Sequence, residues 1–309
     1  MDLLNKTKEL CRVYNIKPAR TKGQNFLISE NVYDKIIEVA ELKKDDVVLE
    51  VGPGLGFLTA KLAEKVKQVI AVELDDKLAN VLRIGLAARG IHPVKSSEAG
   101  VPLQAGQFNG VNNVEVVNEN ILTSPLTPLL IRRGEVKGRG EYKIVANLPY
   151  NITSIFLRKF LSAEHKPSLM ILMLQKEVAE RITSRPGEMS LLAVSVQFYA
   201  KPEIIQVVSK NNFWPAPEVD SAIVSLTPHP SPNLERGVGG EAEFFRLVKI
   251  GFSARRKMLK NNLTNGYHIS PEEAEKWLNK AGFDLKIRAQ ELSVDNWLKI
   301  LEMKRGNVV

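Results

Sequence analysis

The sequence predicts an α/β protein with a doubly wound, mostly parallel sheet of seven strands, followed by a small all-helical domain. Between residues 47 and 228, short apolar runs alternate with amphipathic stretches of helical period. A glycine-rich turn follows the first of these runs, and beyond residue 240 only helical periodicity remains. Strands that alternate with helices favour an open parallel sheet covered on both faces, as in Rossmann-like domains.

The first elements form a βαβα pattern. VVLEV at 47–51 predicts a strand, a helix follows from about Leu58, QVIAVEL at 68–74 predicts the next strand, and a second helix begins at about Asp76. Further apolar runs complete the predicted sheet, at 114–117, 142–147, 169–174, 203–208 and 221–226.

Three segments interrupt this pattern. Residues from about 85 to 112 are rich in glycine and proline and predict a surface insertion, and 123–141 predict a second loop. Residues 229–240 have the composition of a linker. The expected domains are therefore 1–228, which holds the sheet and the insertion, and 241–309, which is helical.

Composition excludes several classes of protein. The 309 residues carry a formal net charge of +8, which favours a polyanionic partner. Cys11 is the only cysteine, and the four histidines lack ligand spacing, so we expect no disulfide and no metal. Because no apolar stretch approaches 18 residues and no apolar segment follows the basic N-terminal residues, we expect a cytoplasmic protein.

The strongest local motif runs from Glu50 to Gly56, with the sequence EVGPGLG, between the first strand and its helix. Glycines at such a turn let the backbone approach a ligand closely. The GxGxG spacing differs from the GxGxxG of dinucleotide sites and fits a cofactor without a pyrophosphate. Glu73 ends the next strand, where its carboxylate can accept hydrogen bonds from both ribose hydroxyls of a nucleoside.

A second motif, Asn147-Leu148-Pro149-Tyr150, ends the fourth strand. An Asn oxygen and a backbone carbonyl that accept hydrogen bonds from an exocyclic adenine amine favour a pyramidal nitrogen, while an aromatic ring stacks on the base. Pro149 stiffens the turn and presents the Leu148 carbonyl. The motif predicts alkylation of an amine without a strong general base.

A third motif is the proline-bracketed segment NFWPAPEVDSA at 212–222, just before the last strand. Its rigidity suits a stacking platform. We expect Phe213 to contact a base and Trp214 to cover the sheet edge.

The chain resembles the ribosomal RNA adenine dimethyltransferase family, and within it the bacterial small-subunit branch. Besides the three motifs above, the matching stretches are GQNFL at 23–27, ELD at 73–75, LQKEV at 174–178, FSARRK at 252–257 and RAQELS at 288–293. They extend nearly from end to end, in family order.

The resemblance implies an S-adenosyl-L-methionine-dependent methyltransferase domain that dimethylates N6 of two adjacent adenines near the 3′ end of 16S rRNA, in immature small subunits. The implied catalytic residues are Asn147, Leu148, Pro149, Tyr150 and Phe213. The implied cofactor-binding residues are Asn25, Leu27, Gly52, Gly54, Glu73, Asn120 and Asn147.

Asn120 is a departure from the family, which usually has an acidic residue near the cofactor adenine. Its amide oxygen can still accept a hydrogen bond, although a shift of one residue would give the role to Glu119. The length of the insertion is a second departure.

The run from Arg246 to Lys260 holds six basic residues and no acidic one. On a helix it predicts contacts with phosphates, while Leu247, Ile250 and Phe252 pack inward. The expected RNA-binding residues are Arg246, Lys249, Arg255, Arg256, Lys257 and Lys260. Basic residues near the N-terminus could supply a second positive edge; they are Lys6, Lys8, Arg12, Lys17, Arg20 and Lys22.

Three other functions compete with this one. A large-subunit adenine methyltransferase shares the catalytic residues but differs in the segment before the last strand and in the C-terminal domain. A DNA adenine methyltransferase would carry Asp or Asn followed by two prolines, which NLPY does not match. A ribosome-assembly factor with weak catalysis is favoured only by Asn120. We expect a monomer, because none of these functions requires a second copy of the chain.

Overall fold

The computed structural model describes residues 2–18, 23–88, 91–93, 111–124, 142–230 and 240–306. The chain forms two compact units. One unit comprises Met1–Glu177 with Glu203–Pro228, and the other comprises Val178–Pro202 with His229–Val309. This division differs from the expected boundary because residues 178–202 group with the C-terminal helices. The expected linker falls largely on residues 231–239, outside the described part.

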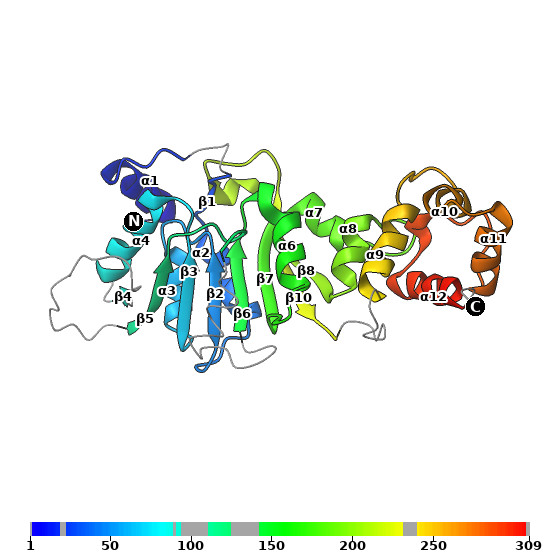
Figure 1. The fold of residues 1–309 in the computed structure, drawn as a ribbon. Coiled ribbons are helices and arrows are strands. Elements are labelled where there is room, and N and C mark those ends of the chain that lie inside the picture. Colours follow the sequence, from blue (N-terminus) through cyan, green and yellow to red (C-terminus); the bar gives the residue numbers. More distant parts are fainter. Residues whose placement is uncertain are drawn as a thin grey trace. The chain divides into compact units, whose positions relative to one another are not determined.

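The first unit is built on one sheet, with the strand order β4-β5-β3-β2-β6-β7-β10-β8 (Figure 1). The strands are β2 (Val47–Val51), β3 (Gln68–Val72), β4 (Ile91–Pro93), β5 (Val111–Val117), β6 (Tyr142–Asn147), β7 (Leu169–Gln175), β8 (Ala200–Val208) and β10 (Ser221–Pro228). The pairs β2·β3, β2·β6, β3·β5 and β6·β7 are parallel, whereas β10 pairs antiparallel with β7.

All seven expected strands are present, and the mostly parallel α/β prediction is confirmed. β2 and β6 match the expected bounds because each is an almost wholly buried apolar run that ends at a sharp turn. The predicted insertion is partly regular, since α4 (Asp76–Ala88) extends into it and β4 adds an edge strand. Residues 94–110 and most of the second expected loop, 125–141, lie outside the described part.

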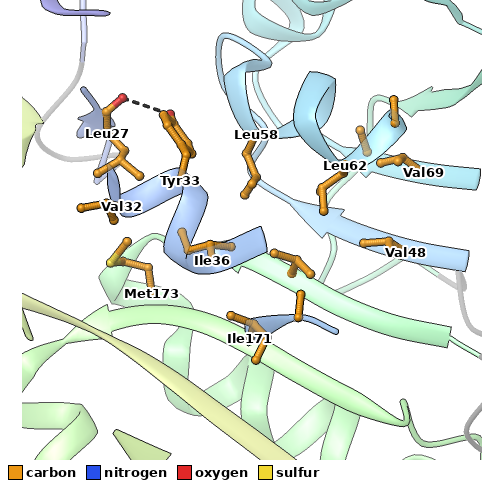
Figure 2. Packing of buried hydrophobic residues seen from close by; sticks show 14 of the residues in the cluster. Leu27, Val32, Tyr33, Ile36, Val48, Leu58, Leu62, Val69, Ile171 and Met173 are labelled. Carbon is orange, nitrogen blue, oxygen red and sulfur yellow. Dashed lines mark hydrogen bonds between the residues drawn. The ribbon is translucent and has the colours of Figure 1, made fainter. Parts of the chain in front are cut away.

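Helices α2 (Glu30–Val39), α3 (Phe57–Ala63) and α4 pack on one face of this sheet. Their buried side chains meet alternate residues of the strands, as Figure 2 shows for Ile36, Leu58 and Leu62 beside Val48 and Val69. The Tyr33 hydroxyl donates a hydrogen bond to the Leu27 carbonyl oxygen over 3.0 Å. The segment before α2 is thereby fixed to the core.

Other elements of this unit are α1 (Leu3–Val13), α6 (Thr153–Leu161) and the 3-10 helices η2 (Tyr150–Ile152) and η3 (Lys210–Asn212). The Lys159 ammonium on α6 donates to the carbonyl oxygens of Ile121, Leu122 and Ser124 over 2.8–3.0 Å. These bonds fix the turn that follows β5.

The second unit is helical, as predicted for the C-terminal domain. Its helices are α8 (Leu191–Gln197), α9 (Gly240–Gly251), α10 (Leu259–Tyr267), α11 (Pro271–Lys280) and α12 (Val294–Arg305), with α7 (Lys176–Ile182) at the boundary and the 3-10 turn η4 (Ala289–Glu291). The ring centroids of Phe198 and Phe244 are 4.5 Å apart, and those of the stacked pair Tyr199 and Phe245 are 5.8 Å apart. This aromatic contact explains why the segment containing α8 belongs with the C-terminal helices.

The run from Arg246 to Lys260 spans the end of α9, a turn and the start of α10. α9 ends at Gly251, where a Cβ atom would lie only 2.2 Å from the Trp297 ring, and α10 starts at Leu259. The buried Asn262 amide donates to the Gly251 and Ala254 carbonyl oxygens and stabilises the intervening turn. Within the described residues, no helix is both long enough and apolar enough to cross a membrane.

Candidate active site

A cavity lies at the carboxyl edge of the sheet, where β2, β3 and β6 end side by side. Parallel strands place the turns that follow them at one edge, and ligands of doubly wound sheets bind there. Ten sequence-predicted residues line this cavity: Asn25, Leu27, Gly52, Gly54, Glu73, Asn147, Leu148, Pro149, Tyr150 and Phe213. The fold therefore brings together residues from five separate segments.

The glycine turn after β2 has a backbone that other residues rarely adopt. Gly54 has a φ of +56°, and a Cβ atom there would lie 3.2 Å from the Phe26 ring. Gly56, with a φ of +77°, precedes α3 and would place a Cβ atom 2.4 Å from Leu82. The turn can therefore run tightly between the Phe26 ring and α4 only because both positions are glycine.

Glu73 follows β3 and is 7% exposed. Its carboxylate accepts hydrogen bonds from the backbone N–H groups of Gly54, over 3.2 Å, and Asp75, over 2.9 Å. Burial raises the pKa of Glu73, while these hydrogen bonds lower it. Since each carboxylate oxygen has a second lone pair, the group can still accept from a ligand hydroxyl.

Glu50 is another carboxyl group in the cavity lining, and it belongs to none of the roles expected from the motifs. It is 1% exposed, and burial raises its pKa to about 8; the Thr59 hydroxyl lowers the pKa and the Glu73 carboxylate raises it. The signal in the sequence was an acidic residue inside an otherwise apolar strand.

The turn after β6 is tied to the segments on either side. Asn147 Nδ2 donates to the Asn25 carbonyl oxygen over 3.5 Å, which leaves Oδ1 of the same amide as an acceptor. The Leu148 N–H donates to the Met173 carbonyl oxygen over 3.3 Å. The arrangement presents an amide oxygen and a backbone turn at one wall of the cavity.

Tyr150 forms the next part of this wall. Its hydroxyl lies 2.8 Å from Oγ of the fully buried Ser221. Burial raises the pKa of Tyr150, so the phenol stays neutral and its ring is available for stacking.

Phe213 reaches the cavity through a short strand pair. β9 (Phe213–Trp214) pairs antiparallel with β1 (Phe26–Leu27), so that Leu27 faces Phe213 and Phe26 faces Trp214. Phe213 is 3% exposed and lines the cavity. Trp214 packs against an apolar cluster that includes Phe26.

Asn120 and Glu119 are both exposed, and neither is among the lining residues of the cavity. Asn120 Oδ1 accepts from the Leu122 N–H over 2.9 Å, and the Glu119 carboxylate accepts from the Ser124 hydroxyl. Both side chains thus stabilise their own turn. Asn118, a residue that the sequence did not single out, donates to the Glu73 carbonyl oxygen over 2.9 Å.

In the second unit, three of the expected RNA-binding residues line a surface groove that is also lined by apolar side chains. Arg246, Lys249 and Arg255 line it, together with Ile250 and Phe252. Those two apolar side chains are only half-buried, whereas Leu247 is fully buried as expected. The guanidinium of Arg246 lies 5.1 Å from the centroid of the Tyr267 ring, which orients it.

The remaining basic residues differ in their surroundings. Arg256 and Lys257 are exposed on the turn between α9 and α10, whereas Lys260 forms an ion pair with Glu275 over 2.7 Å. Near the N-terminus, Lys6, Lys8, Arg12 and Lys17 are exposed on and after α1, while Arg20 and Lys22 lie outside the described residues.

Comparisons with known proteins agree with this geometry. Residues 16–95 and 101–305 match the profile of the family described as Ribosomal RNA adenine dimethylase. The chain therefore belongs to the ribosomal RNA adenine dimethylase family. It is an rRNA adenine dimethyltransferase, and the family expectation from the sequence is confirmed.

Relatives within the dimethylase family match nearly the whole chain. A ribosomal RNA small subunit methyltransferase A of Dehalococcoides mccartyi is 42% identical over 307 residues, covering 99% of this chain and 94% of the relative. A protein of the same name from Clostridioides difficile is 34% identical over 295 residues, covering 95% and 93% of the two chains.

Two solved structures share the fold. A dimethyladenosine transferase from Plasmodium falciparum has a TM-score of 0.68 and 25% identity, covering 90% of this chain and 96% of that one. The 23S rRNA methyltransferase ErmE has a TM-score of 0.66 and 28% identity, covering 90% and 99%.

Proposed function

We propose that this protein transfers methyl groups from S-adenosyl-L-methionine to N6 of two adjacent adenines near the 3′ end of 16S rRNA, giving N6-dimethyladenine. The observation that carries the proposal is the single cavity lined by the glycine turn, Glu73 and the turn from Asn147 to Tyr150. The relatives named small subunit methyltransferase A favour the small subunit over the large one. The immature small subunit is the proposed substrate, and the protein acts on it as a cytoplasmic monomer.

The cavity fits S-adenosyl-L-methionine in chemistry. Glu73 offers buried acceptor oxygens for the ribose hydroxyls, and Gly52 and Gly54 give a wall of backbone without side chains. Asn25 and Leu27 would hold the methionine end. When bound, the cofactor supplies a methyl group activated by a sulfonium centre.

Asn120 remains the proposed contact of the cofactor adenine. Its turn is tied to the site, because the neighbouring Asn118 is hydrogen-bonded to the Glu73 backbone. Its amide oxygen would exchange the Leu122 N–H for the adenine amine.

The chain's own residues position the target amine. Oδ1 of Asn147 and the Leu148 carbonyl oxygen accept hydrogen bonds from its two N–H groups, which draws the nitrogen lone pair out of conjugation with the ring. Tyr150 and Phe213 stack on the base, and Pro149 keeps the turn extended, with a φ of −57° and a ψ of 130°. The alkylated amine is acidic enough to lose its proton to water, so no strong base is needed.

The second unit supplies RNA affinity in this proposal. The expected contacts are Arg246, Lys249, Arg255, Arg256, Lys257 and Lys260. Exposed cations such as Arg255 and Arg256 bind phosphates without reading sequence, so selection of the target depends on RNA shape and on an extruded adenine.

The test is transfer of labelled methyl from S-adenosyl-L-methionine to small ribosomal subunits that lack the modification, with large subunits in parallel. We expect label in the small subunit only, recovered as dimethyladenine after digestion of the RNA. Label in the large subunit would favour a large-subunit adenine methyltransferase. Binding of cofactor and RNA without transfer would contradict catalysis and favour an assembly factor.

A further inference from the structure

A second cavity adjoins the first near the turn after β6. Its lining includes Tyr150 and Asn151, Gln175 at the end of β7, and Pro217 and Val219 from the loop before β10. Gly23, Asn25 and Tyr150 line both cavities, so the two share a wall. We propose that this second cavity binds the unpaired adenine next to the one being methylated, and that the Gln175 carboxamide reads its edge.

The lining is suited to a base and not to a phosphate. Among the lining residues none is basic, and Glu218 places an exposed carboxylate at the rim, which repels phosphate. Pro217 and Val219 add aliphatic surface, with Val219 44% exposed. A flat, uncharged ligand with hydrogen-bonding edges matches this combination.

Gln175 has the chemistry that distinguishes adenine. Its side chain is half-buried, and within the described residues its carboxamide has no hydrogen-bond partner. A carboxamide donates to N7 of adenine and accepts from its N6 amine, whereas guanine presents two acceptors at the same edge. Gln175 therefore favours adenine over guanine.

A base in this cavity is not the reacting base. Asn147 and Leu148, which would orient the reacting amine, line only the first cavity. The shared wall makes the second cavity the place for a neighbouring nucleotide of the same strand.

The position of Gln175 is rigid. It faces Ser221 in the antiparallel pairing of β7 with β10, and the Ser221 hydroxyl lies 2.8 Å from that of Tyr150. The next residue, Lys176, donates its N–H to the Asp220 carbonyl oxygen over 3.0 Å. The Gln175 carboxamide and the Tyr150 ring are thus both held next to Ser221, at the start of β10.

The inference rests on the proposed function, so the test separates the two. Small subunits are assembled from 16S RNA in which one of the two adjacent adenines is guanine, and kcat/KM for the remaining adenine is compared with that on the natural RNA. For the wild type we expect a loss of about 5- to 100-fold on the guanine template. In Gln175→Met, which keeps the side-chain volume, we expect the two templates to become equal.

Two controls accompany this test. Asn211→Ala, an exposed amide outside both cavities, should keep the wild-type preference, and the affinity of Gln175→Met for S-adenosyl-L-methionine should be unchanged. The inference would be overturned if Gln175→Met kept the wild-type preference for the natural template over the guanine template, or if the wild type had no such preference. Absence of transfer by the wild type on natural RNA would instead overturn the proposed function, and the inference with it.

Discussion

Glu50 and Glu73, two of the carboxyl groups that line the cavity, have different surroundings and different expected effects. Glu73 is held by backbone donors from two turns, so its oxygens are fixed in position before a ligand arrives. Replacement by Gln removes one acceptor and the charge. We expect Glu73→Gln to lower the affinity for S-adenosyl-L-methionine by about 10- to 100-fold in equilibrium dialysis. Glu64→Gln, on the exposed end of α3, is the control, and equal affinities for both variants would refute this role.

Glu50 predicts a dependence of stability on pH. Its pKa is raised by burial from 4.5 to about 8, so between these values the folded state holds a proton that the unfolded state has lost. The contribution of Glu50 to the free energy of unfolding is therefore fully present below pH 4.5 and decreases as the pH rises towards 8. Relative to Glu50→Gln, the wild type should lose on the order of a few kcal/mol between pH 5 and pH 8 in urea unfolding. A difference that does not change with pH would contradict the buried, protonated state.

Among the single residues of the site, those that belong to a recognisable sequence motif, such as Glu73 and Asn147, could be predicted from the sequence. The role of Asn118 could not be predicted, because its hydrogen bond to the Glu73 carbonyl oxygen depends on the distance between two strand ends. Nor could the sequence reveal the raised pKa of Glu50, because that requires knowledge of what surrounds the side chain in the fold.

At the scale of elements, the start of α3 depends on a glycine. An alanine at residue 56 would be strained at a φ of +77° and would press on Leu82, so we expect Gly56→Ala to lower the free energy of unfolding by about 2–4 kcal/mol. Gly85, within α4, has open space around it, and Gly85→Ala should raise the free energy of unfolding by about 0.5–1 kcal/mol. Thermal unfolding of both variants tests these two predictions. A change in the free energy of unfolding with the same sign in both variants would be inconsistent with this account.

The helices and strands also show which local sequence patterns are enough to predict an element. β2 and β6 were predictable because burial on both faces requires continuous apolar runs. The pairing of Phe26 with Trp214 was not predictable, because it joins segments 188 residues apart and neither segment is long enough to show the alternation of a strand. The turn between α9 and α10 was not predictable either, because the Asn262 amide that holds it through the Gly251 and Ala254 carbonyl oxygens reaches them only in the fold.

At the scale of the whole molecule, the excess of positive charge predicts binding to RNA that weakens with salt. Arg255, Arg256 and Lys257 are exposed on one turn, and replacing all three by Ala should reduce the slope of log affinity against log salt by up to about 3. Titration of small-subunit RNA over a range of KCl concentrations measures this slope. Lys299→Ala, an exposed lysine on α12, should change it by no more than about 1. An unchanged slope for the triple variant would mean that this turn does not contact phosphates.

The central claim is that the turn after β6 carries out the methyl transfer, and Asn147→Ala tests it most directly. The measurement is single-turnover transfer of labelled methyl to unmodified small subunits, with affinities for cofactor and RNA determined on the same preparations. We predict a rate about 100- to 1000-fold below the wild type at saturating cofactor and RNA, since the amine loses one of its two acceptors. A rate within a few-fold of the wild type under these conditions would contradict the account.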